Sequence, residues 1–182
     1  MEGKLKLRYN KLLRQAEAIF TSIENLPEET IYQKPDANSW SIAQVIAHLV
    51  SVEKVTLGYL VNKKYEEIRN RGNWRNRLNY GMLNLALRSR FKFKVPPVEA
   101  LKPEDKPELS QHINDWKEVQ LNLKKYLEGF PAEAQQRMVF RHPLAGALTI
   151  EQCLSFMLQH MQHHLPQLNR LLPKSRQIER IG

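Results

Sequence analysis

Apolar residues recur every three or four positions in four separate stretches of the chain, which is the spacing that one buried face of an α-helix requires. The pattern predicts four long amphipathic helices, at residues of about 5–24, 41–64, 109–128 and 149–172. The second and fourth helices each open on a capping-box sequence, "SIAQ" from Ser41 and "TIEQ" from Thr149. No set of strands is indicated, so the sequence predicts an all-α, four-helix bundle.

The connection between the second and third predicted helices is much longer than the other two. It spans residues 65–108 and contains "LNYGMLNLALRSRF", whose apolar spacing predicts a short accessory helix. The following "RFKFKV" alternates apolar and basic residues, as an extended edge segment does. A crossover of this length allows the second and third helices to run in the same direction. We expect residues 1–182 to form a single domain.

Composition restricts the class of protein. Of the 182 residues, 42% are hydrophobic and 26% are charged, which excludes fibrous and disordered classes. No apolar run reaches the roughly 20 residues of a membrane span, and "MEGKLKLRYN" lacks the apolar core of a signal peptide. The single cysteine, Cys153, excludes an internal disulfide framework. We therefore expect a cytoplasmic protein without a membrane partner.

The positive charge is concentrated in one region. The formal net charge is +9, and residues 63–94 hold ten basic and only two acidic side chains. Aromatic residues are interleaved with these cations, a combination that single-stranded nucleic-acid binders use. Binding of nucleic acid or another polyanion through residues 63–94 is therefore an alternative function, although no recognition motif supports it.

Three of the six histidines, His160, His163 and His164, lie within five consecutive positions of the last predicted helix. On a helical projection His160 and His164 fall in the buried stripe one turn apart, whereas His163 falls on its flank. On the second helix, His48 lies at the edge of the apolar face. The pattern therefore places three imidazoles at or near the core.

A buried imidazole costs about 1–3 kcal/mol for each ring nitrogen that finds no partner, and a metal ion removes that cost. Spacing of i, i+4 presents two such nitrogens to one point, and Zn²⁺, Ni²⁺ or Fe²⁺ accepts imidazole ligands. His48 lies roughly 10 Å after the start of its helix, and His164 roughly 12 Å before the end of its own. If these helices are antiparallel, His48 becomes the third ligand, and the fourth position stays open for water or substrate.

Several residues near this cluster have a simpler interpretation. A lone core histidine is more often bonded to a carbonyl, and Cys153 is better explained as a buried small hydrophobe than as a nucleophile. Gln167 either orients a ligand ring or is a surface amide, and Glu53 is a weak candidate for a general base. The H-E-x-x-H motif of zincin proteases and the glycine loops that bind phosphate are both absent. A metal that only closes the bundle is a further alternative.

Two stretches place the candidate ligands in a recognisable setting. The first reads "NSWSIAQVIAHLVSVE", with Trp40 before the helix and His48 in an "AHL" sequence. The second reads "HPLAGALTIEQCLSFMLQHMQHHLPQLNRL", with the pattern H-x-x-x-H-x-x-Q at His160, His164 and Gln167. In these features the chain resembles the DinB/YfiT-like superfamily, in outline over nearly its whole length and in motif over about 50 residues.

The resemblance implies an up-down-down-up bundle, a divalent metal held by His48, His160 and His164, and a homodimer. Nickel or zinc is the metal that it favours, with iron or manganese as alternatives. Some members are described as hydrolases, and others are transferases that use a low-molecular-weight thiol. The implied partner is a small-molecule substrate such as a thiol, and the implied function is that of a metal-dependent enzyme. Independently of the resemblance, the basic residues 63–94 favour an anionic substrate.

Overall fold

The structure, a computed structural model, describes residues 3–62, 74–88 and 101–182. Four long helices form the body of the molecule: α1 (Gly3–Ile23), α3 (Ile42–Asn62), α5 (Leu109–Glu128) and α6 (Ile150–Leu171). Where the structure describes their ends, these helices begin and end within about two residues of the predicted positions. The predicted four-helix bundle is therefore confirmed.

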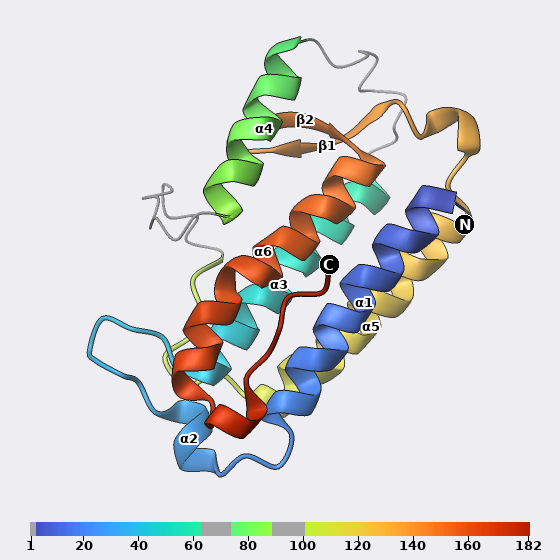
Figure 1. Ribbon diagram of the computed structural model, residues 1–182. Coiled ribbons are helices and arrows are strands. Elements are labelled where there is room, and N and C mark those ends of the chain that lie inside the picture. Colours follow the sequence, from blue (N-terminus) through green and yellow to red (C-terminus); the bar gives the residue numbers. More distant parts are fainter. Residues whose placement is uncertain (1–2, 63–73, 89–100) are drawn as a thin grey trace.

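Figure 1 shows how the four helices are arranged. α3 and α5 run in one direction, and α1 and α6 run in the other, which gives the up-down-down-up order. α3 packs against both α5 and α6, and α1 packs against the same two helices from the other side. α3 and α6, which carry the candidate ligands, are therefore antiparallel neighbours.

The bundle is held together by the apolar stripes that define the helices in the sequence. Fully buried side chains come from all four helices, among them Leu12, Ile19, Ile46, Leu49, Trp116, Leu123, Leu127 and Leu154. Burial of a side chain of this size contributes about 1.5–3 kcal/mol, so the four stripes together fix how the helices face one another.

Capping boxes set the first turns of the two helices that carry the histidines. The backbone N–H of Ser41 donates to Gln44 Oε1 at 3.1 Å, and the N–H of Gln44 donates to Ser41 Oγ at 3.3 Å. Thr149 and Gln152 exchange the equivalent bonds at 2.9 and 3.3 Å. Both predicted boxes are present, and each fixes the residue at which its helix begins.

The predicted accessory helix is also present. It is α4 (Trp74–Arg88), which packs against α6 and against a short strand, with Leu83 buried. The predicted extended segment "RFKFKV" lies outside the described residues, as does most of the basic region 63–94. None of the helices that the structure describes is long and apolar enough to cross a bilayer.

The structure contains a hairpin that the sequence analysis did not predict. Strands β1 (Met138–His142) and β2 (Gly146–Thr149) pair in antiparallel fashion just before α6, with an irregularity between Met138 and Phe140. These strands are short and lack a clear alternation of apolar and polar residues, so their pattern was not recognised. Gly146, which pairs with His142, has a φ of 74°, a conformation that favours glycine.

Shorter elements complete the description. α2 (Glu28–Tyr32) and the 3-10 turns η3 (Ala132–Ala134) and η4 (Lys174–Arg176) lie in connections or after α6. After η4 the chain turns back between α1 and α6, as Figure 1 shows. There Gln15 and Gln162 bond to the backbone of the last residues.

Candidate metal centre

The structure brings His48, His160 and His164 together between α3 and α6. One ring nitrogen of each can be chosen so that all three lie within 4.8 Å of one another. The Nε2 atoms of His48 and His160 are 3.3 Å apart. His164 completes the group, with its ring centre 5.0 Å from that of His48 and 4.9 Å from that of His160. All three candidate ligands predicted from the sequence therefore occupy one place in the fold.

Hydrogen bonds orient two of the three rings. Nδ1 of His48 donates to the backbone carbonyl of Leu101 at 2.9 Å, and Nδ1 of His164 donates to Gln167 Oε1 at 3.1 Å. A proton on Nδ1 leaves the Nε2 lone pair of a neutral imidazole free. This arrangement of an outer acceptor and an inward lone pair is typical of histidines that bind metal.

Aromatic side chains enclose the cluster. The indole of Trp40 lies 5.0 Å from the His48 ring, and it stacks on the His164 ring at 6.3 Å with an angle of 13°. Phe156 lies 5.8 Å from His160. The rings retain some exposure to solvent. The cluster therefore has apolar walls and stays accessible to a small molecule.

Burial and mutual proximity keep these imidazoles neutral. Burial lowers the pKa of His48, and the bond to Leu101 opposes this effect only in part. Burial, followed by the neighbouring histidines, lowers the pKa of His160 well below its ordinary value and that of His164 to about 3. At neutral pH the cluster therefore presents nitrogen lone pairs and no positive charge.

A divalent cation fits this donor set. Two nitrogens bound to a tetrahedral ion at about 2.0–2.1 Å lie roughly 3.4 Å apart, close to the separation of His48 and His160. The remaining separations are no more than 4.8 Å, which small rotations of side chains would close. Among the described residues, the Nε2 atom of His48 faces the Nε2 atom of His160, another imidazole nitrogen. A cation accepts all three lone pairs at once.

Gln167 offers a test of how the ligands are oriented. We expect Gln167→Leu to weaken metal affinity about 10-fold to 100-fold, because the His164 ring loses the acceptor that fixes its tautomer. Gln167→Glu keeps an acceptor oxygen, so its affinity should stay at or above the wild-type value. Isothermal titration with Zn²⁺ measures both, and equal affinities in the two variants would contradict this role.

His163, the third histidine of the last helix, lies outside the cluster. Its Nδ1 donates to the backbone carbonyl of Leu87 at 3.1 Å. The side chain therefore ties α4 to α6 next to the candidate ligands.

His142, to which no sequence pattern assigns a role, is buried beside the cluster. Its Nδ1 accepts the backbone N–H groups of Leu144 and Ala145 at 3.1 and 3.2 Å. Its ring contacts Phe156 at 4.5 Å, and burial lowers its pKa to about 4. His142 thus closes the hairpin turn and faces the wall of the site. The one sequence signal for this position is the "HPLAG" stretch, which forms the turn between β1 and β2.

The surroundings of Cys153 and Glu53, two other candidates from the sequence, do not support a catalytic role. Cys153 is completely buried, and burial raises the pKa of its thiol, as expected of a small hydrophobe. Glu53 is buried against α5, where Gln120 Nε2 donates to its Oε2 at 2.5 Å. Its carboxyl group belongs to the α3–α5 interface, so its position does not support a general-base role.

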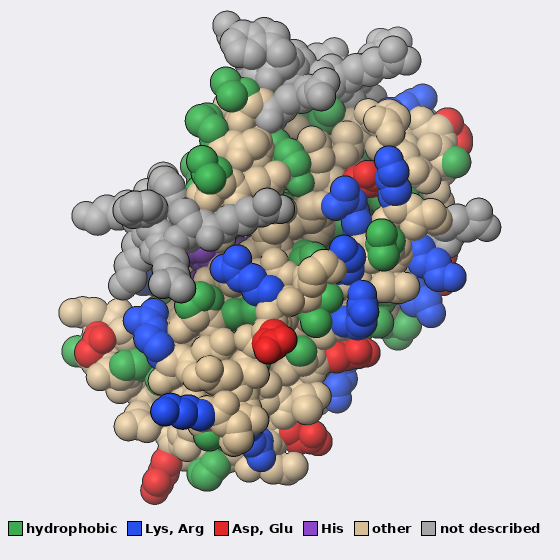
Figure 2. Space-filling view, in the orientation of Figure 1, with side chains coloured by type: hydrophobic (Ala, Val, Ile, Leu, Met, Phe, Trp, Pro, Cys, Tyr) green, Lys and Arg blue, Asp and Glu red, His purple; other side chains and the backbone are tan. Residues whose placement is uncertain are grey.

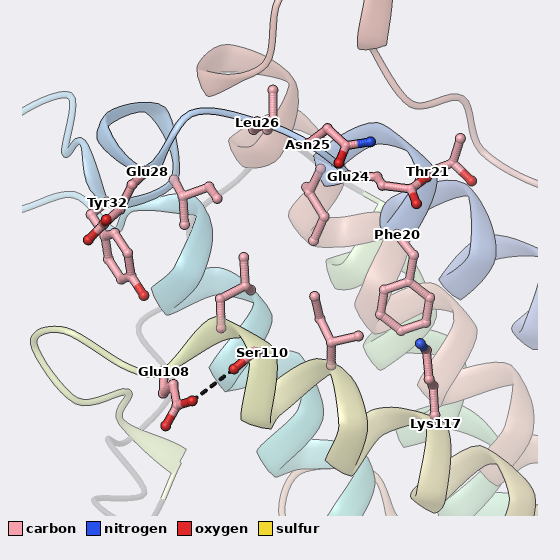
Figure 3. A pocket seen from close by; sticks show the side chains of 14 residues that line it. Phe20, Thr21, Glu24, Asn25, Leu26, Glu28, Tyr32, Glu108, Ser110 and Lys117 are labelled. Carbon is pink, nitrogen blue, oxygen red and sulfur yellow. Dashed lines mark hydrogen bonds between the residues drawn. The ribbon is translucent and has the colours of Figure 1, made fainter.

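A separate pocket of about 550 Å³ lies between the end of α1, α2 and the start of α5. Figure 3 shows Phe20 and Lys117 on one side, and Glu108 bonded to Ser110 on another. None of the described residues that line it is a histidine or cysteine. It therefore lacks the donor set of the histidine cluster.

Comparison with known proteins places the fold and the cluster in context. The family model described as the DinB superfamily matches residues 11–168, a range that includes all three histidines. The chain is similar in structure to YfiT from Bacillus subtilis, described as "a probable metal-dependent hydrolase with an unusual four-helix bundle topology". The TM-score is 0.55 at 14% identity, over 92% of this chain and 85% of that one. Among curated proteins, none matches significantly. Since the family model spans most of the sequence, the chain belongs to the DinB superfamily.

Proposed function

We propose that this protein is a metal-dependent enzyme whose divalent cation is bound by His48, His160 and His164. The observation that carries the proposal is the meeting of three neutral imidazoles from two antiparallel helices, two of them oriented by acceptors behind the ring. Membership of the DinB superfamily and the likeness to YfiT support the same assignment.

The donor set favours a borderline metal. Imidazole nitrogen suits zinc and nickel first, and iron or manganese less well. A cation held by three neutral ligands supplies Lewis-acid activation of a water molecule or of a substrate oxygen or sulfur atom. We infer a hydrolase or a thiol transferase on this chemistry.

Residues around the cluster orient the ligand rings and favour the approach of particular substrates. Leu101 and Gln167 fix the ligand tautomers, and the indole of Trp40 restricts rotation of the His48 and His164 rings. Partial exposure of the cluster leaves an approach for a small substrate. The net charge of +9 favours the approach of an anionic substrate, including a low-molecular-weight thiolate.

The proposal predicts that catalysis and metal content change together. Protein purified without immobilised nickel should contain about one divalent metal ion per chain by elemental analysis. A panel of small esters, amides, phosphate esters and thiol acceptors should include a substrate whose turnover stops with a chelator and returns with the metal. This result is expected because three protein ligands would leave a bound metal one position for water or substrate.

A structural metal would behave differently. In that case the fourth position is saturated by the protein, and no exchangeable water is detected by relaxation of solvent protons with a paramagnetic ion such as Mn²⁺ or Co²⁺ in the site. Stoichiometric metal without exchangeable water, together with no turnover on the panel, would contradict the enzymatic proposal while leaving the metal site intact.

A further inference from the structure

α4 exposes an apolar stripe on the face opposite to the one that packs on the protein. Leu78, Met82 and Leu85 are 55%, 56% and 71% exposed. Their i, i+4, i+7 spacing aligns them along one side of the helix. Leu83 of the same helix is buried in the core. Figure 2 shows hydrophobic side chains gathered over α4. The helix therefore has two apolar sides. The described part of the protein covers the side with Leu83, and the side with Leu78, Met82 and Leu85 is exposed.

All the charged residues in the sequence around this stripe are basic. Residues 68–94 contain eight lysines and arginines and no aspartate or glutamate. An exposed stripe of aliphatic side chains is thus set within a stretch of sequence that carries only positive charge. A partner for this surface has to offer both an apolar phase and negative charge.

An anionic lipid surface meets both requirements. Amphipathic helices that lie in the headgroup region bury an apolar stripe among the acyl chains, and nearby lysines and arginines attract the anionic headgroups. We propose that α4 is a peripheral docking helix that inserts Leu78, Met82 and Leu85 into the interface of an anionic phospholipid bilayer. This adds a membrane contact to a chain whose sequence predicts none, and it does not depend on the metal site.

Two other occupants match the surface less well. A second copy of the chain would pair this stretch of sequence with another that also carries only positive charge, and like charges repel. Single-stranded nucleic acid would satisfy the cations, but bases stack on aromatic rings, whereas the exposed side chains of the stripe are leucine and methionine. The combination of aliphatic and cationic residues favours lipid.

The contact between α4 and the rest of the fold transmits such docking to the whole domain. Leu83 is buried, and the backbone carbonyl of Leu87 accepts the Nδ1–H of His163 on α6. The bundle would therefore remain attached to α4 when the helix lies on a bilayer.

The test is sedimentation of the full-length protein with lipid vesicles. Wild-type protein should bind vesicles of phosphatidylglycerol and phosphatidylcholine in equal parts, and it should not bind vesicles of phosphatidylcholine alone. Raising salt from about 50 mM to about 500 mM should weaken binding, because the attraction to headgroups is screened. The triple variant Leu78→Gln, Met82→Gln, Leu85→Gln should lose at least about ten-fold in partitioning.

A matched control separates the stripe from surface hydrophobicity in general. Leu7, Val55 and Leu121 are each more than half exposed and lie on α1, α3 and α5. Replacing these three by glutamine should leave vesicle binding at the wild-type level. Far-UV circular dichroism of both triple variants verifies that the helices remain folded.

Several results would overturn the proposal. They are absence of wild-type binding to the anionic vesicles, equal binding by wild type and the stripe variant, and binding to a single-stranded oligonucleotide without binding to vesicles. Light scattering, which measures the oligomeric state, provides a further test. If the stripe variant turns a dimer into a monomer while vesicle binding is unchanged, the stripe is an interface between copies.

Discussion

Replacing His164 by alanine is expected to abolish binding of a divalent metal while leaving the helix content largely intact. A ring nitrogen of this residue lies within 4.8 Å of those of His48 and His160, and its Nδ1 proton is already committed to Gln167. Loss of a direct ligand should reduce affinity by more than the roughly 100-fold that loss of an outer hydrogen-bond partner reaches. Titration with Zn²⁺ and far-UV circular dichroism measure the two quantities.

The neighbouring residue provides the control. His163→Ala removes an imidazole one position away that bonds to Leu87 and does not join the cluster. It should keep wild-type metal affinity and stoichiometry. Metal retention by His164→Ala at the wild-type level, or equal loss in both variants, would refute the assignment of the ligands.

The second large effect is expected at Glu53, whose replacement by glutamine should remove a strong pH dependence of stability. Glu53 is buried at the α3–α5 interface, where the side-chain amide of Gln120 donates a hydrogen bond to its carboxyl group. Burial raises its pKa to about 8 from 4.5, while the Trp116 indole and Gln120 oppose this in part. Tyr9 of α1 also faces this interface, where its hydroxyl donates to the backbone carbonyl of Gln120.

Proton binding by Glu53 determines whether stability rises or falls with pH. Between pH 4.5 and 8 the folded protein keeps a proton on Glu53 that the unfolded chain has released. The contribution of Glu53 to stability is therefore complete below pH 4.5 and is lost as the pH rises towards 8. Each pH unit in that range costs about 1.4 kcal/mol, so the free energy of unfolding should fall by about 4 kcal/mol between pH 5 and 8.

Urea unfolding at several pH values measures this effect. Glu53→Gln should be close to wild type at pH 5 and more stable than wild type at pH 8, because glutamine stays neutral throughout. The control is Glu118→Gln, which removes an exposed carboxylate of α5 and should keep the wild-type slope. Parallel curves for wild type and Glu53→Gln across this pH range would show that Glu53 is not responsible.

Much of the fold could be predicted from local pattern. The stripes at three-residue and four-residue spacing gave the four long helices, since burial of one face is what selects a helix of that sequence. The capping boxes at Ser41 and Thr149 located two helix starts. The hairpin before α6 could not be found in this way, because its nine strand residues are stabilised by pairing with each other and by packing on the bundle, not by a period of their own.

The candidate site likewise has some features that local sequence pattern predicts and others that depend on tertiary packing. The sequence by itself determined that His160 and His164 share one helical face, because a fixed rotation of about 100° per residue places i and i+4 together. It also limited His48 to a similar depth on its own helix. Only the tertiary structure decided that α3 lies beside α6 in the register that brings these rings into contact.

The tertiary structure alone also supplied the partners from distant parts of the chain: the Leu101 carbonyl behind His48, the His142 ring beside Phe156 and the Leu87 carbonyl that holds His163. Periodicity is a property of neighbouring residues and survives in any amphipathic helix. Contacts between residues far apart in sequence depend on how whole helices pack, and no local pattern encodes that packing.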